Sequence, residues 1–132
     1  MYDLIIIGGG PAAVAAAVYA ARKRLKTVLI TESFGGQSIV SADIQNWIGE
    51  PHISGFDLAQ KFEAHVRAHA DIVEVKSPEK TVAVRKVNCA PGEAVCDFEV
   101  ETDQGNRYGG RAVILAAGAR RIFQVCKCFR RG

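Results

Sequence analysis

The chain has 132 residues, close to the roughly 150 of a typical domain, so its length favours one domain with one core. Hydrophobic residues make up 48% and charged residues 23% of the chain, a globular balance that excludes disordered, collagen-like and coiled-coil proteins. The net charge of +3 comes from the last residues, because Arg120, Arg121, Lys127, Arg130 and Arg131 have no acid among them; the mildly acidic remainder argues against nucleic-acid binding.

The first 32 residues predict a strand, a helix and a second strand. Residues 2–7 are an isoleucine-rich run that ends in three glycines, as is typical of a central parallel strand. Pro11 suits the first turn of a helix, and residues 12–24 are rich in alanine and end in basic residues, which complement a helix C-terminus. Residues 27–31 then predict a β-branched strand, so a βαβ unit of about 30 residues is complete.

The middle of the chain predicts a long loop, a helix and a strand. Residues 33–54 show no sustained period, so we expect a loop with about one helical turn. A helix is predicted after Ser54 and Gly55, ending at about residue 70, and a strand at 72–75. The apolar face of this helix is predicted to carry Phe56, Leu58, Ala59, Phe62, His65 and Val66.

The hydrophobic period changes to two between residues 81 and 108. Turn residues interrupt the alternation at 90–92 and again at 103–106, which predicts an antiparallel meander. Residues 112–115 predict a last buried strand after it.

The sequence carries weak metal signals and no membrane signal. No apolar run approaches the roughly 20 residues of a membrane span, so we expect a cytoplasmic protein with no membrane partner. His65 and His69 are four residues apart, but a solvated helix face explains them, and His52 has no evident partner. We expect no metal site, because zinc-knuckle spacing is absent from the four cysteines, which are Cys89, Cys96, Cys126 and Cys128.

A glycine motif follows the first strand and opens the first helix. Gly8, Gly10 and Ala13 form the pattern GxGxxA, which is typical of dinucleotide-binding βαβ units. The first glycine allows the tight turn, the second lets a pyrophosphate approach the backbone, and the small third residue lets the helix pack on the strand. The free N–H groups at the helix N-terminus then face the diphosphate.

Glu32 follows the second strand about 20 residues beyond the glycine motif. A carboxylate at this place accepts hydrogen bonds from the ribose hydroxyls of a bound dinucleotide, and it repels a 2′-phosphate. Together with the glycine motif it predicts an α/β fold with a Rossmann-like core of parallel strands and an inserted antiparallel β-meander.

Several segments resemble the thioredoxin reductase family, which includes the flavoprotein component of alkyl hydroperoxide reductase. The resemblance covers about residues 1–121, and the sequence GGQ at 35–37 is more specific than the glycine motif. The segments that carry it are 2–17, 31–37, 45–49 (QNWIG) and 116–119.

The resemblance implies that the chain binds FAD. It places Gly8, Gly10, Pro11, Ala12 and Ala13 around the pyrophosphate and Glu32 at the ribose. It also places Gly36, Gln37 and Asn46 along the ribityl and flavin side, where an amide offers both a donor and an acceptor. Val75 is expected near the adenine, and Ala117 and Gly118 are expected to close over the diphosphate, with Ala117 standing where the family has threonine.

The family's electron path runs from NAD(P)H through flavin to a disulfide, and the sequence lacks parts of it. The family's NADPH-binding domain, its CxxC and its closing Gly-Asp segment have no counterpart here, so we expect no NAD(P)H site and no catalytic residue. We expect a partial FAD-binding domain at 1–121 and a basic tail at 122–132, as a truncated or shifted reading frame would leave. The alternative is a non-catalytic dinucleotide-binding module or inactive fragment, completed by a homodimer or by another chain.

Overall fold

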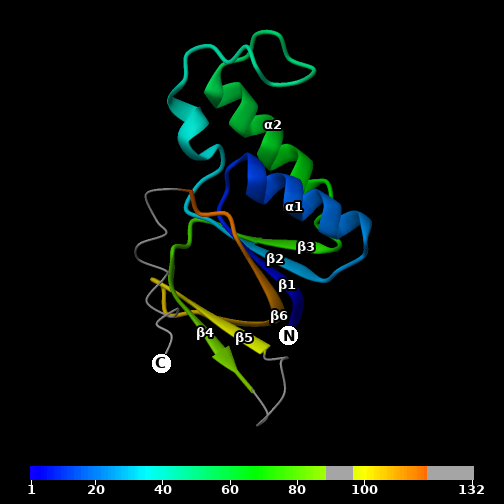
Figure 1. The fold of residues 1–132 in the computed structure, drawn as a ribbon, viewed down its shortest axis with the longest axis vertical. Coiled ribbons are helices and arrows are strands. Elements are labelled where there is room, and N and C mark those ends of the chain that lie inside the picture. The colour runs from blue at the N-terminus through cyan, green and yellow to red at the C-terminus, as the bar shows by residue number, and fades with distance from the viewer. Residues whose placement is uncertain (89–96, 119–132) are drawn as a thin grey trace.

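The computed structural model describes residues 1–88 and 97–118 (Figure 1). These residues form a mixed β-sheet with two α-helices and one short 3-10 helix, in the predicted α/β class. No helix within them is long and apolar enough to cross a membrane. The elements in chain order are β1 (Tyr2–Ile7), α1 (Pro11–Arg22), β2 (Thr27–Ile30), η1 (Gly36–Val40), α2 (Gly55–Arg67), β3 (Val73–Lys76), β4 (Thr81–Val87), β5 (Asp97–Thr102) and β6 (Arg107–Leu115).

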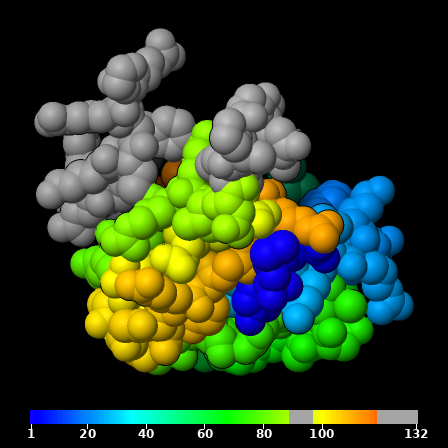
Figure 2. All heavy atoms as spheres, turned by 90° about the horizontal axis from the view of Figure 1, so that it is seen from below, coloured from blue at the N-terminus to red at the C-terminus, as the bar shows by residue number. Residues whose placement is uncertain are grey.

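One sheet with the strand order β3-β2-β1-β6-β5-β4 joins all of these strands. β3, β2, β1 and β6 run parallel, whereas β5 and β4 are antiparallel additions beyond β6. The predicted parallel core and antiparallel meander are therefore both confirmed. Seen from below, the amino end of β1 lies between β6 in orange and the segment before β2 in light blue, in agreement with this order (Figure 2).

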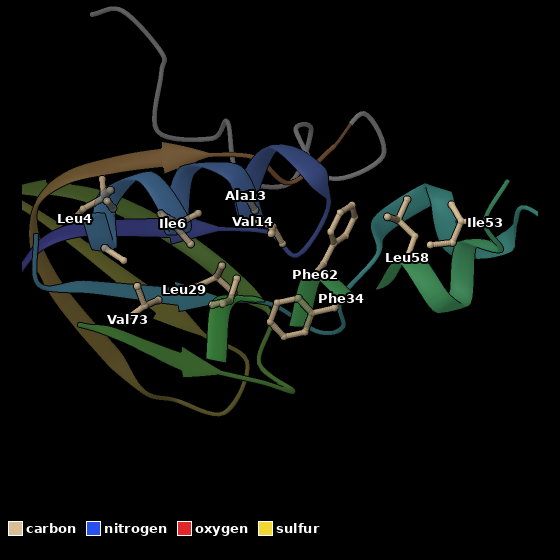
Figure 3. Close-up of a cluster of buried hydrophobic side chains, with 14 residues drawn as sticks. Leu4, Ile6, Ala13, Val14, Leu29, Phe34, Ile53, Leu58, Phe62 and Val73 are labelled. Carbon is tan, nitrogen blue, oxygen red and sulfur yellow. The ribbon is translucent and has the colours of Figure 1, made fainter. Parts of the chain in front are cut away.

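Both faces of β1 are buried, which explains its run of isoleucines. Leu4 and Ile6 point to the helix side, where they join Leu29 of β2 and the apolar faces of α1 and α2 (Figure 3). Ile5 and Ile7 point to the opposite side. Because neighbouring residues of a strand point to opposite faces, residues 4–7, which are covered on both sides, are all apolar.

The antiparallel strands cover the second face of the parallel core. Val100 of β5 and Tyr108 of β6 are buried with Ile5 and Ile7 in one cluster, and Val84 of β4 packs against it. In Figure 1, β4 and β5 lie below the parallel strands while the two helices lie above them. The meander therefore acts as the third layer of the fold.

The helices begin near their predicted starts and end earlier than predicted. Ser54 caps α2 by accepting a hydrogen bond from the backbone N–H of Asp57 at 3.0 Å. α1 ends at Arg22 rather than residue 24, because Arg24 has a left-handed backbone with φ of 58°. α2 ends at Arg67, short of the predicted residue 70.

Two residues of the predicted apolar face of α2 do not reach the core. Phe56 is 59% exposed, because at 100° per residue it lies roughly 160° around the helix from buried Leu58. His65 is also exposed, which keeps its ring nitrogens in water, and its ring lies 5.9 Å from the ring of His69.

The prediction of a last buried strand at 112–115 was wrong in two respects. These residues are the second half of β6, which begins at Arg107 as the third strand of the meander. Ile114 and Leu115 are 38% and 47% exposed. Among the described residues, β1 pairs with this half of β6 while β5 pairs with residues 107–110, so the outer edge of this half has no strand beside it. The hairpin signal at 90–92 and the boundary at 121 fall outside the described residues.

We expect amide exchange to be slowest at residues 5–7 of β1 and 28–30 of β2, which are buried on both faces, and clearly faster at residues 113–115 of β6. Hydrogen exchange measured by NMR at neutral pH checks this order. Equal protection of residues 113–115 and 5–7 would show that β6 is as central as β1.

Candidate functional site

Three loops meet at the carboxyl ends of β1, β2 and β6. The N–H of Gly8 donates to the carbonyl of Ile30 at 2.9 Å, which joins the end of β1 to the end of β2. The N–H of Ala116 donates to the carbonyl of Ile7 at 2.8 Å, and the N–H of Gly35 donates to the carbonyl of Gly9 at 2.9 Å. The glycine loop at 8–10 therefore lies between segments 31–36 and 116–118, at the edge where open α/β sheets bind ligands.

The first two glycines of the loop are required by packing. Gly8 has φ of 127°, and a Cβ there would lie 2.3 Å from the carbonyl oxygen of Ala116. A Cβ on Gly9 would lie 2.3 Å from the carbonyl oxygen of Ser33. The sequence motif identifies Gly8 but not Gly9, because only the fold brings Ser33 against it.

Gly10 differs from both because the space beside its Cα is open. A Cβ on Gly10 would meet only the Cα of Gly36, at 3.9 Å, an ordinary contact. Its backbone, with φ of −81° and ψ of −177°, is one that any residue adopts. The glycine is therefore required neither by strain nor by packing, and the space beside its Cα is open.

Gly36 lies opposite Gly10 across this open space. Its φ is 56°, and a Cβ on it would lie 3.2 Å from the Cα of Gly10. Gly36 is therefore the residue of this pair that favours glycine, because its backbone is left-handed and a Cβ on it would be tight against Gly10.

The N-terminus of α1 opens into the same place. Gly10 is the N-cap, no side chain caps the helix, and no acidic residue stands in its first turn. The backbone N–H groups of Ala12 and Ala13 lie in the first turn, where helices have no internal acceptors. Ala13 itself is fully buried against the sheet, as the motif predicts. The N-terminal end of α1 thus has the free N–H donors and the positive end of the helix dipole, both of which favour an anion.

Glu32 lies two residues beyond β2, beside the glycine loop, and is half-buried. Its carboxylate has a neighbour that the sequence analysis missed: the ammonium of Lys80 lies 4.0 Å from Oε1. Lys80 is 48 positions further along the chain, so only the fold could reveal the pair.

The other predicted ligand residues lie in four other segments and differ in how far they are exposed. Gln37 is exposed in η1, Ala117 is half-buried beyond β6, and Gly118 is exposed. Val75 is half-buried in β3 against the helix-side core. Asn46 is exposed in a hairpin between Ile44 and Ile53, at the end of α2 in the upper part of Figure 1. Neighbouring Trp47 anchors that hairpin, as its edge contact with Phe62 shows at 5.2 Å.

The buried carboxylate of Glu79 is a second feature that the sequence analysis missed. Glu79 is only 8% exposed, and its oxygens accept the hydroxyl of Tyr108 at 2.9 and 3.0 Å and the amide of Asn106 at 3.1 Å. Burial and the Glu79 carboxylate raise the pKa of Tyr108 far above its ordinary value. In the sequence, residues 77–80 and 103–106 show only ordinary turn signals, so nothing there indicates their contact.

The described residues contain no cluster of three or more metal-ligating side chains. The four cysteines all lie outside these residues. His52, expected to have no partner, lies 3.1 Å from a carboxylate oxygen of Asp43. Hydrogen bonds from Gln45 and then His52 lower the pKa of Asp43. This exposed pair lies in the loop before α2.

We expect Tyr108→Phe to lower the free energy of unfolding by about 1–3 kcal/mol, because Glu79 loses a hydroxyl donor inside the protein. Urea denaturation measures the change. Tyr19→Phe is the matched control, since Tyr19 is 71% exposed and its loss should have little effect. Equal stability of both variants would mean that the hydrogen bonds between Tyr108 and Glu79 contribute nothing to the free energy of unfolding.

The fold and the glycine loop define an α/β domain of the Rossmann type. The family model for pyridine nucleotide-disulphide oxidoreductases matches residues 2–127. The chain is 38% identical over 120 residues to the F component of alkyl hydroperoxide reductase from Pseudomonas aeruginosa, covering 90% of this chain and 22% of that protein. It is 34% identical over 126 residues to thioredoxin reductase of Bacillus subtilis, covering 90% and 34%.

Solved structures agree with the family model. The crystal structure of thioredoxin reductase from Streptococcus pyogenes superposes with a TM-score of 0.75 at 35% identity, over 90% of this chain and 36% of that chain. The chain belongs to the pyridine nucleotide-disulphide oxidoreductase family and is similar to its thioredoxin reductases. It spans about a fifth of the alkyl hydroperoxide reductase components and about a third of the thioredoxin reductases that it matches.

Proposed function

We propose that this chain is the FAD-binding part of a thioredoxin-reductase-like flavoprotein oxidoreductase. The observation that carries the proposal is the open space beside Gly10, the N-cap of α1. Neither backbone strain nor packing requires a glycine at this position. A diphosphate suits this place, because the uncapped N–H groups of the first turn of α1 favour an anion and no Cβ stands between them and a ligand.

The candidate residues divide between the two halves of FAD. Gly8, Gly10, Pro11, Ala12 and Ala13 would hold the pyrophosphate, with the N–H groups of the first helical turn as donors. Glu32 would accept the ribose hydroxyls, Val75 would lie toward the adenine, and Ala117 and Gly118 would cover the diphosphate.

The amides of Gln37 and Asn46, with the backbone of Gly36, would serve the ribityl and flavin side. The hairpin that carries Asn46 lies at the N-terminal end of α2. When bound, the flavin supplies the hydride chemistry, and the residues of this chain bind and orient it. We assign no catalytic residue to this chain.

The proposed partners and domain limits follow the same reasoning. We propose that residues 1–121 form the FAD-binding unit, that residues 122–132 are an appendage, and that a second copy or a complementing chain completes the flavin side. NADPH oxidation by the purified chain with added FAD separates electron transfer from the alternative, a non-catalytic nucleotide-binding module. Turnover above that of free FAD supports the enzyme; binding without turnover supports the module.

We expect Gly10→Val to weaken FAD binding about 100-fold while changing the stability of the fold by at most about 1 kcal/mol. The valine side chain would enter the open space beside Gly10 and displace backbone hydrogen bonds to the diphosphate, and the loss of two charge-assisted bonds accounts for an effect of this size. Fluorescence titration with FAD measures binding, and thermal unfolding measures stability.

The matched control is Gly109→Val in β6. A Cβ on Gly109 meets nothing within 4 Å, and Gly109 lies in a strand, so valine is tolerated there. Gly109 is beside Gly110, which pairs with Tyr2 at the amino end of β1, whereas the glycine loop follows its carboxyl end. Equal FAD affinity in Gly10→Val and Gly109→Val would contradict the assignment of the glycine loop as the diphosphate site.

A further inference from the structure

The loop between β3 and β4 is fastened to the turn between β5 and β6. The N–H of Lys80 donates to Oδ1 of Asp103 at 3.0 Å, and the N–H of Asp103 donates to the carbonyl of Lys80 at 2.8 Å. The amide of Gln104 donates to the carbonyl of Pro78. The N–H and the carbonyl of Lys80 are therefore both bonded to Asp103, which holds its backbone in place.

The buried carboxylate of Glu79 strengthens the same contact. It accepts the amide of Asn106 and the hydroxyl of Tyr108, both from the far side of the turn. Its own N–H donates to the carbonyl of Thr31 at 3.0 Å, next to Glu32. The meander is thus connected directly to the segment that carries the proposed ribose ligand.

The position of the Lys80 ammonium follows from these contacts. The N–H of Glu79 is bonded to Thr31, and both the N–H and the carbonyl of Lys80 are bonded to Asp103. These bonds hold the backbone from which the Lys80 side chain extends. Its ammonium lies 4.0 Å from the Glu32 carboxylate, with the two side chains 39% and 32% exposed. A ribose hydroxyl bound to Glu32 at about 2.7 Å would lie within roughly 7 Å of this ammonium, inside the Debye length of about 8 Å at physiological salt.

We propose that Lys80 is a second specificity-determining residue of the adenosine end. Its positive charge offsets that of Glu32, so the pair accepts the 2′-hydroxyl and also tolerates a 2′-phosphate that Glu32 alone would repel. The ligand class is therefore adenosine nucleotides with either a hydroxyl or a phosphate at the 2′ position. This inference rests on the proposed nucleotide site.

The test compares 5′-ADP with 2′-phospho-5′-ADP as ligands of the full chain by calorimetry. We expect Lys80→Met to increase the preference for 5′-ADP over the 2′-phosphorylated ligand by about two- to fivefold, the range for a half-exposed ion pair. Lys80→Arg keeps the charge and should keep the original ratio. In the Glu32→Gln background, the 2′-phosphorylated ligand should bind better than it does with Glu32 present.

Lys86→Met is the matched control for the loss of charge. Lys86 is exposed on β4, six positions beyond Lys80 and so roughly 20 Å distant, and its loss should leave the ratio unchanged. If Lys80→Met and the unsubstituted chain show the same ratio, the inference is overturned while the nucleotide site stands. If the unsubstituted chain binds neither ligand, the proposed function fails and this inference fails with it.

Discussion

The structure depends on the close approach of three backbones at the carboxyl ends of β1, β2 and β6. Gly8 lies so near Ala116, and Gly9 so near Ser33, that a single Cβ on either would overlap a carbonyl oxygen. These contacts fix where α1 begins and where the second loop turns. Gly10, which follows, lies beside open space. Gly8 and Gly9 are thus required by packing, whereas Gly10 is the glycine that we assign to ligand binding.

The parallel core needs cover on both faces, and the chain supplies it in two different ways. α1 and α2 cover one face of β1 and β2, while the antiparallel strands cover the other through Val100 and Tyr108. β6 belongs to both systems, since its first half pairs with β5 and its second half with β1. The second half of β6 is therefore only partly covered: Val113 packs against the cluster of the second face, while Ile114 and Leu115 stay exposed.

The meander has a second role through its turn at residues 103–106. Hydrogen bonds from this turn hold Glu79 and the backbone of Lys80, and Glu79 in turn is bonded to Thr31. A buried carboxylate with neutral donors on both oxygens is stable only while those donors are in place. The contact therefore joins the third layer of the fold to the candidate nucleotide site, and the proposed role of Lys80 depends on it.

The sequence by itself determined the class of fold and the position of the glycine loop. An isoleucine run before three glycines, an alanine-rich helix and a second short strand form a local pattern, and local patterns need no tertiary knowledge. The change of period at residue 81 likewise predicted the meander. The C-terminal limits of the helices were less well predicted, because the left-handed backbone of Arg24, which follows α1, has no clear signal in the sequence. The apolar face of α2 was predicted too wide, since Phe56 lies on the side of the helix away from Leu58.

Only the tertiary structure decided which residues meet. The pairing of Lys80 with Glu32, the burial of Glu79 and the requirement for Gly9 all join positions that are far apart in sequence or depend on a neighbouring loop. The exposure of Ile114 and Leu115 is another case, since an apolar run predicts a strand but not how many of its sides are covered. Strand period is a property of the local backbone, whereas burial depends on which other elements pack against that backbone.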